Sequence, residues 1–140
     1  MYRFPSEEWV AKYKEAINTN PAYKVGGASW NKGVVALICQ ANPGVGIDED
    51  VGIWLDLHQG VCREARLCTA DEASKAPFVI SGPYQRWKQV IMKELDPIQG
   101  MLQGKLRLKG DLPTIVRYVE ASKALVESAG LVETDFPDEL

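Results

Sequence analysis

The chain has 140 residues, which fits a single domain, and its 46% hydrophobic and 25% charged residues are ordinary values for a folded protein. The net charge of −3 argues against a nucleic-acid-binding protein that works through bulk positive charge. No apolar run approaches the roughly 20 residues of a membrane-spanning helix, and the N-terminus lacks the apolar core of a secretory signal. The sequence therefore predicts a cytoplasmic protein whose three cysteines remain reduced thiols.

The first predicted element is a helix that begins after Ser6, a typical N-cap residue. Its apolar residues recur at helical spacing and predict one buried face: Trp9, Val10, Tyr13, Ala16 and Ile17. The segment 18–21 ends this helix. The continuous apolar run 34–39 lies between glycines and a proline, which predicts a strand buried on both faces.

Two alternating strands are predicted next, over 50–58 and 61–69. In the first of them one face carries only aliphatic residues, namely Val51, Ile53, Leu55 and Leu57. A short turn at 58–60 joins the two strands. Three consecutive strands with short turns predict an antiparallel meander with one packed face and one solvated face.

A fourth strand is predicted over 77–81, and a helix starts at Pro83, where a proline in the first turn is tolerated. The inward stripe of this helix comprises Tyr84, Trp87, Val90, Ile91 and Leu95. Asp96-Pro97 ends the helical pattern, because proline donates no backbone hydrogen bond and restricts the residue before it. The glycine-containing segment 98–104 is expected to be a flexible apolar hinge.

The last predicted elements are a fifth strand over 105–109 and a helix capped by Asp111. In the strand, cations alternate with Leu106 and Leu108 and share the opposite face. The helix is expected to turn one apolar face inward: Ile115, Val116, Val119, Val126 and Ala129. Residues 1–132 then form one domain, and the acidic tail 133–140 is expected to fray. The fold class is α+β, with a five-stranded, mostly antiparallel sheet and helices packed on one face.

Several of these motifs carry a family resemblance. The residues 95–97 and 101–112 resemble the C-terminal signature of the sterol carrier protein type 2 family, in which an aspartate precedes an apolar loop, a glycine, a basic alternating strand, another glycine and a closing helix. The segment 78–87 also fits, because an apolar strand runs into a Trp-containing helix. The resemblance covers about residues 6–130. It implies a hydrophobic cavity between sheet and helices that binds a fatty acid, a fatty acyl-CoA or a sterol, without a cofactor.

With that cavity, the inward faces predict which residues contact lipid. The strands would contribute Ile53, Leu55, Leu57, Phe78, Ile80, Leu106 and Leu108, and the helices Trp87, Ile91, Val116 and Val119. Ile98, Met101 and Leu102 would form the entrance. Lys105, Arg107 and Lys109 are candidates for contact with a lipid headgroup or, transiently, with an anionic membrane. The same residue types would also fill a solid core, so an assembly module or a homodimer remains an alternative.

Catalytic chemistry has little to build on in this sequence. His58 is the one histidine, and it shares a strand face with Asp56 and lies near Cys62 across the turn. A dyad using these residues is the enzymatic alternative, but a solvated turn histidine is the simpler interpretation. The cysteines do not show paired zinc-ligand spacing. The sequence therefore predicts a non-catalytic protein with no metal and no nucleic-acid partner.

Overall fold

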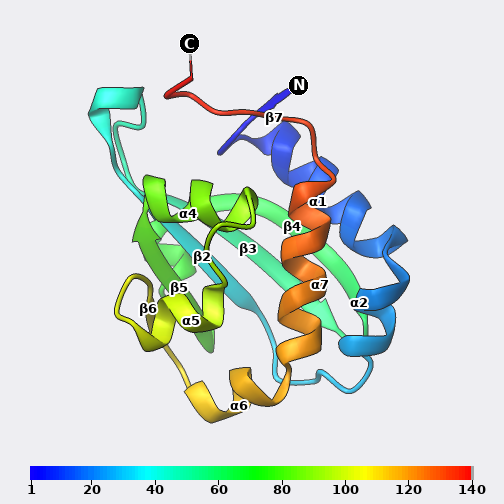
Figure 1. Ribbon diagram of the computed structural model, residues 1–140. Helices are drawn as coiled ribbons and strands as arrows, with labels where there is room; N and C mark the ends of the chain where they lie inside the picture. Colours follow the sequence, from blue (N-terminus) through cyan, green and yellow to red (C-terminus); the bar gives the residue numbers. More distant parts are fainter. Residues whose placement is uncertain (140) are drawn as a thin grey trace.

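A five-stranded sheet forms the centre of the computed structural model, which describes residues 1–139 (Figure 1). The strands lie in the order β4-β3-β2-β5-β6. Their bounds are Val35–Gln40 for β2, Val51–His58 for β3, Val61–Thr69 for β4, Phe78–Pro83 for β5 and Arg107–Lys109 for β6. All neighbouring pairs are antiparallel except β2 and β5, which run parallel. The predicted α+β class and mostly antiparallel sheet are confirmed.

The parallel pair arises from the connection after β4. This strand lies at the edge, and the chain returns through the short helix α3, Ala70–Ala73, across the outer face of the sheet to β5. Small residues allow the close approach: Ala36, Ala73 and Ala76 are each at most 2% exposed and pack together with Val79. The central strand β2 is thus covered on both faces, as its continuous apolar run predicts.

The inner face of the sheet is covered by the other helices (Figure 1). Their bounds are Glu7–Thr19 for α1, Pro21–Gly26 for α2, Tyr84–Ile91 for α4, Pro97–Leu102 for α5, Leu112–Arg117 for α6 and Val119–Gly130 for α7. A short 3-10 turn, η1, spans Pro43–Val45. Ser6 accepts a hydrogen bond from the backbone N–H of Trp9 and caps α1 as predicted.

Three local expectations are corrected by the structure. The segment expected to be a hinge forms α5, because the Asp96 carboxylate accepts a hydrogen bond from Ile98 N and caps the helix. The expected strand 105–109 pairs only from Arg107. The expected single last helix breaks at Tyr118 into α6 and α7, and this break changes which side chains face inward.

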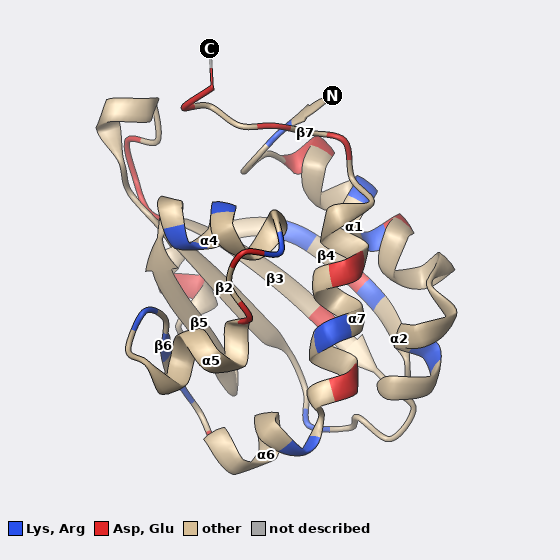
Figure 2. Cartoon of the chain, in the orientation of Figure 1, with Lys and Arg blue, Asp and Glu red and all other residues tan. Residues whose placement is uncertain are grey.

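The C-terminal segment lies against the body of the protein over residues 133–139, whereas the sequence favoured a frayed tail; Leu140 lies outside the described residues. Strand β7, Thr134–Asp135, pairs in parallel with β1, Tyr2–Arg3. Further along, the Asp138 carboxylate accepts hydrogen bonds from the Tyr84 hydroxyl at 2.6 Å and from Lys88 Nζ at 3.0 Å. Figure 2 shows this acidic segment passing beside the N-terminus. The negative charge of Asp138 therefore helps to hold the C-terminal segment against α4.

Asn20 joins three helices at one point. Its backbone follows the end of α1, and its side-chain oxygen caps α2 by accepting a hydrogen bond from Ala22 N at 2.9 Å. Its amide nitrogen reaches α7, donating to Ser128 Oγ at 3.1 Å and approaching the Ala124 carbonyl at 3.3 Å. Asn20 is only 7% exposed, so these bonds are shielded from water.

We expect Asn20→Ala to lower the free energy of unfolding by about 2–4 kcal/mol, because it removes a helix cap and leaves buried α7 acceptors with fewer partners. Urea unfolding followed by circular dichroism measures this loss. Thr19→Ala is the matched control, since the Thr19 hydroxyl is exposed and bonds only within its own helix. A loss no larger than that of the control would contradict the joining role of Asn20.

The tail contacts give stability a dependence on pH. The Tyr84 hydroxyl, with help from Lys88, lowers the pKa of Asp138 from 3.8 to about 2. Since the folded-state pKa lies below the unfolded one, the ionised carboxylate stabilises the fold above pH about 4, and this contribution disappears as the pH falls towards 2. Wild type should exceed Asp138→Asn in stability at pH 6, and the gap should close near pH 2. A gap that stays constant over this range would contradict the assignment, and Asp48→Asn, on an exposed loop, controls for net charge.

Candidate functional site

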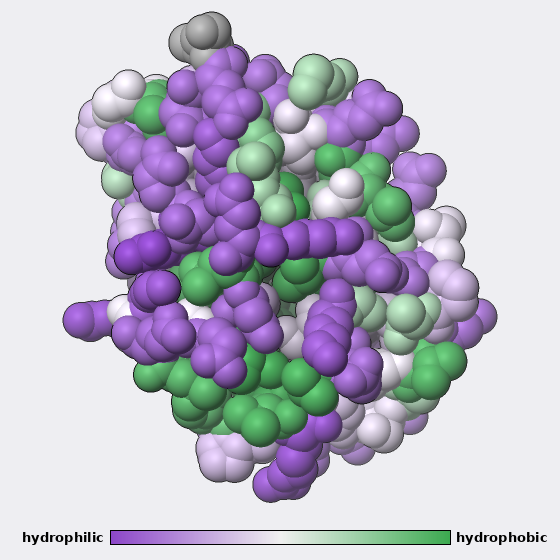
Figure 3. Space-filling model, viewed as in Figure 1, coloured by the Kyte–Doolittle hydropathy of each residue, from purple (hydrophilic) through white to green (hydrophobic). Residues whose placement is uncertain are grey.

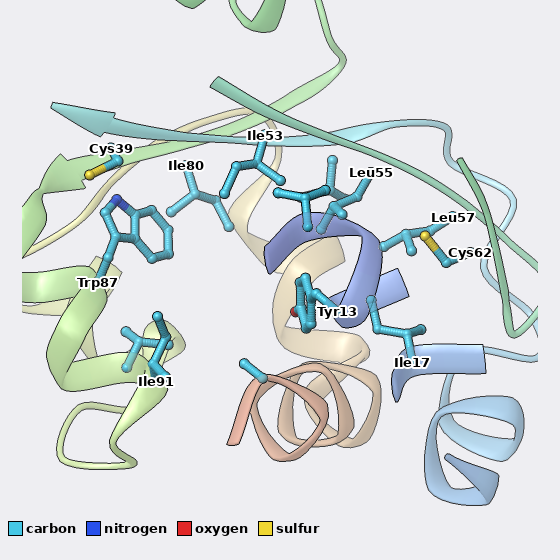
Figure 4. Packing of buried hydrophobic residues seen from close by; sticks show 14 of the residues in the cluster. Tyr13, Ile17, Cys39, Ile53, Leu55, Leu57, Cys62, Ile80, Trp87 and Ile91 are labelled. Carbon is cyan, nitrogen blue, oxygen red and sulfur yellow. The ribbon is translucent and has the colours of Figure 1, made fainter. Parts of the chain in front are cut away.

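An apolar cavity of about 120 Å³ lies between the inner face of the sheet and the helix layer. The strand side of its wall is formed by Val35, Leu37, Cys39, Ile53, Leu55, Leu57 and Ile80. Figure 4 shows the labelled members of this set pointing from the strands towards the helices, with Trp87 and Ile91 of α4 approaching from the side. The alternation of β-strand side chains brings these residues onto one face.

The helix side of the wall comes mainly from α7. Its lining residues recur at helical spacing and form one stripe along that helix: Ala121, Ser122, Leu125, Val126 and Ala129. Because three of the five are alanine or serine, the helix presents little volume towards the sheet, and space remains between the two layers.

Seven of the residues predicted to contact lipid lie on this wall: Ile53, Leu55, Leu57, Ile80, Trp87, Ile91 and Met101. Phe78, Ile98 and Leu106 are buried and Leu108 is half-buried, but these four pack outside the cavity wall. Leu102, Val116 and Val119 are exposed, at 58%, 44% and 36%. The helix break at Tyr118 explains why Val116 and Val119 are exposed. Because the backbone leaves helical geometry at Tyr118, α7 turns Ala121 and Leu125 towards the cavity instead.

Apart from Trp87, the aromatic part of the wall is absent from the predicted list of lipid-contacting residues. Side chains from the N-terminal segment, from α1 and α2 and from two loops line the cavity: Phe4, Trp9, Tyr13, Tyr23, Trp30 and Tyr118. The helical stripe of α1 contained Trp9 and Tyr13 and could have indicated a wall. Trp30 and Tyr118 lie in irregular segments, where periodicity gives no signal. Their rings meet edge to face at 5.0 Å between centroids.

Most polar tips of these aromatic rings bond to the protein. The indole N–H groups of Trp9, Trp30 and Trp87 each donate at 2.9 Å, to Thr134 Oγ1 and to the carbonyls of Gly33 and Ile38. The Tyr13 hydroxyl donates to the Leu125 carbonyl at 3.0 Å. These bonds fix the rings at the cavity edge. The wall residues, all in the described part of the chain, include no charged side chain.

One opening of the cavity lies between α7 and the α4–α5 region. Pro97 and Met101 of α5 line the cavity opposite Ser122 and Val126 of α7. The space-filling view shows an apolar hollow at this place, surrounded by polar atoms (Figure 3). Lys93 follows α4 in a left-handed conformation with φ of 62°, and its side chain lies against Gly130 at the end of α7.

The residues of the possible catalytic dyad are not assembled into a site. Asp56 accepts two hydrogen bonds from Arg63, at 2.9 and 3.2 Å, so its carboxylate is already engaged. Across the hairpin Cys62 pairs with Leu57, and its buried thiol bonds to the Glu64 carbonyl at 3.4 Å. Burial raises the pKa of Cys62 to about 11. His58 alternates to the other face of the strand. Over residues 1–139 no cluster of three or more metal-ligating side chains occurs.

The cations of the fifth strand lie on the face away from the cavity. Leu106 and Leu108 pack on the inner core, so Lys105, Arg107 and Lys109 project outward and are exposed. Lys109 Nζ donates to the Ser74 carbonyl beside α3 on the outer face. The strand therefore does not place these three charges over the cavity.

Comparison with known proteins identifies the family. The family described as the SCP-2 sterol transfer family matches residues 14–122, most of the chain. The chain belongs to the SCP-2 sterol transfer family. The family resemblance and the fold predicted from the sequence are thus confirmed.

Solved structures of this family share the architecture. A crystal structure of sterol carrier protein 2 is 30% identical, with a TM-score of 0.84, covering 91% of this chain and 97% of that one. A conserved protein of Thermus thermophilus is also 30% identical, with a TM-score of 0.80 and coverage of 89% and 85%. The apo form of sterol carrier protein 2 from Yarrowia lipolytica, 12% identical over 90% of this chain and 87% of that one with a TM-score of 0.52, shares the fold alone.

No match to this chain is found among curated proteins. Within residues 1–139, no helix combines the length and the apolar character that crossing a bilayer requires.

The three free thiols should differ in reactivity under native conditions. Cys39 and Cys62 are each 1% exposed, and burial raises the pKa of Cys39 to about 12, so both should react slowly with a thiol reagent. Cys68 is half-buried and should be labelled first. Mass spectrometry of peptides after timed alkylation measures the order, with urea-unfolded protein as the control in which all three react. Labelling of Cys62 before Cys68 would contradict the buried placement.

Proposed function

We propose that the protein binds and transfers lipids by holding a hydrocarbon chain or a sterol-like ring system in this cavity, with fatty acids and fatty acyl-CoA as the other candidate cargo. The observation that carries the proposal is an uncharged cavity between sheet and α7 in a member of the SCP-2 sterol transfer family. The reduced thiols fit a cytoplasmic location, which is part of the same proposal.

Apolar contact alone supplies enough affinity for this role. Each buried methylene contributes roughly 0.8 kcal/mol, so ten of them give about 8 kcal/mol before the cost of ordering the ligand. That is the range of micromolar dissociation constants. A wall without charges suits a carrier, because it holds varied chains without requiring one headgroup.

The size of the cavity limits how much of a lipid chain it can hold. A cavity of about 150 Å³ holds one benzene molecule, so the 120 Å³ here takes only a short part of a lipid. A full chain therefore needs the wall to move or the chain to extend through the opening. The region most suited to move is α5, which has six residues, carries the flexible Met101 on the wall and is followed by Gly104 with φ of 76°.

The exterior beside the opening favours a membrane as the source of lipid. Figure 3 shows an apolar patch over α5 and α6, and the exposed side chains Leu102 and Val116 belong to these helices. Lys105 and Arg107 are exposed close by in sequence and make no ion pair among the described residues. We therefore propose that this end of the molecule, with Lys109 more peripheral because it bonds Ser74, approaches an anionic surface transiently.

Two other functions receive less support. A homodimeric assembly module would be favoured by a filled core, but a cavity is present. An enzyme that uses His58 would need Asp56 or Cys62, and the first is bonded to Arg63 while the second is buried. The carrier function accounts for more of the observed structure.

A cavity-filling substitution tests the carrier function. Val126 lines the wall on α7, so Val126→Phe should occupy the space of several methylenes and weaken binding of a fluorescent fatty acid by about 10- to 100-fold. Fluorescence titration, with displacement by unlabelled palmitate, measures this change. Native mass spectrometry of gently purified protein would show which lipid is carried.

The matched control is Val119→Phe, which makes the same change on the same helix at an exposed position outside the wall. It should leave the dissociation constant unchanged. Equal effects of the two substitutions, or no saturable binding of fatty acid, acyl-CoA or sterol probes to wild type, would contradict the proposal.

A further inference from the structure

One aromatic residue on the cavity wall has a polar tip without a protein partner. Among the Trp and Tyr residues of the wall, five bond to the protein through their polar tips: Trp9, Trp30 and Trp87 to acceptors on neighbouring segments, Tyr13 to Leu125 and Tyr118 to Ser29. The sixth, Tyr23 on α2, makes no side-chain hydrogen bond within residues 1–139. A polar atom in such a position needs an explanation.

The Tyr23 hydroxyl is nevertheless not sealed in the core. Throughout the described chain, every side-chain nitrogen or oxygen that is completely buried has a hydrogen-bond partner. Because the Tyr23 hydroxyl has none, it must touch open space, although the residue as a whole is only 1% exposed. Tyr23 is also one of the residues that line the cavity.

The position of the ring is fixed by its neighbours. A Cβ atom at Gly27 would lie 2.9 Å from Tyr23 Cζ and 3.1 Å from its hydroxyl oxygen, so only glycine leaves room for the ring there. Gly26 meets the backbone of α7 equally closely, since a Cβ atom on Gly26 would lie 2.9 Å from Ala121 N. The hydroxyl is thus held where α2 packs against α7.

We propose that the Tyr23 hydroxyl faces the cavity and is a specificity-determining hydrogen-bond donor for an uncharged oxygen of the lipid, such as a hydroxyl, a ketone or an ester carbonyl. This inference rests on the proposed lipid-binding function and adds the polarity of the preferred ligand. The preferred ligand then places a neutral polar group at the α2 end of the cavity and its hydrocarbon part in the rest of the cavity.

The surroundings of Tyr23 select against a charged group. The wall carries no charged side chain, and a carboxylate moved into such a place without a counter-ion is strongly disfavoured. Burial raises the pKa of Tyr23, so the hydroxyl keeps its proton at neutral pH and can donate it. Ser122, the other hydroxyl-bearing wall residue apart from the tyrosines, is only half-buried and can be hydrated. A fatty acid would therefore leave its carboxylate at the opening.

A purely apolar ligand should bind less well than its volume suggests. Covering the Tyr23 hydroxyl with hydrocarbon removes it from any water in the cavity without giving it a partner, which costs free energy. An oxygen at the same place removes that cost. The cavity is thus expected to discriminate between isosteric ligands that differ only in this group.

Toluene and phenol test the inference, because they replace a methyl by a hydroxyl and are small enough for a cavity of this size. Dissociation constants for both, measured by ligand-observed NMR titration of the full chain, give a phenol-to-toluene preference for each variant. Tyr23→Phe should reduce this preference about 3- to 10-fold relative to wild type. Its melting temperature should not fall, since the hydroxyl makes no bond to the protein.

Tyr13→Phe is the matched control on the same wall. Its hydroxyl already donates to the Leu125 carbonyl, so this substitution should lower the melting temperature and leave the phenol-to-toluene preference unchanged. If both probes bind and Tyr23→Phe keeps the wild-type preference, the inference is overturned while the lipid-binding proposal stands. If neither probe binds and no fatty acid is displaced, both are overturned.

Discussion

The hydrogen bonds that fix aromatic rings at the edges of the interior are the constraint on which this structure depends. An apolar space between a sheet and a helix tends to collapse, because close packing is favourable. Here Trp9, Tyr13 and Trp87 line the space while their polar tips bond to Thr134 and to backbone carbonyls. A ring held at its polar end cannot turn inward without losing that bond. Asn20 adds a second restraint by tying α7 to the junction of α1 and α2. The cavity persists because its walls are anchored outside it.

The same arrangement accounts for the chemical character of the interior. Since the protein itself bonds to nearly every polar tip of the aromatic rings on the wall, the wall offers a ligand mainly hydrocarbon surface. Such a wall fits the proposed binding of a hydrocarbon chain. The thiol of Cys62, which the sequence placed near His58, faces the inner side of the sheet and is bonded to Glu64. Family membership and wall chemistry therefore point to the same role.

The two ends of the molecule differ in how firmly they are held. At one end, β1 pairs with β7 and the Asp138 carboxylate bonds to Tyr84 and Lys88, so the chain termini hold each other and the start of α4. At the other end, α5 and α6 are short helices with exposed apolar side chains, including Leu102 and Val116. We propose that α5, a six-residue helix with Met101 on the wall, is the part that moves when a large ligand exchanges.

The sequence by itself determined the elements whose signals are local. Alternation in 51–57 predicted which side of β3 faces inward, and Ile53, Leu55 and Leu57 do lie on the wall; the ordered motifs in 78–112 predicted the family. Only the tertiary structure decided the rest. The break at Tyr118 left Val116 near the end of α6 and Val119 at the start of α7, both exposed. Trp30 lies on the wall although it belongs to a loop, where sequence periodicity gives no signal. The tail docked because Tyr84 and Lys88, some fifty residues away, complement Asp138. Such long-range pairings depend on which surfaces meet after folding, and no local pattern encodes them.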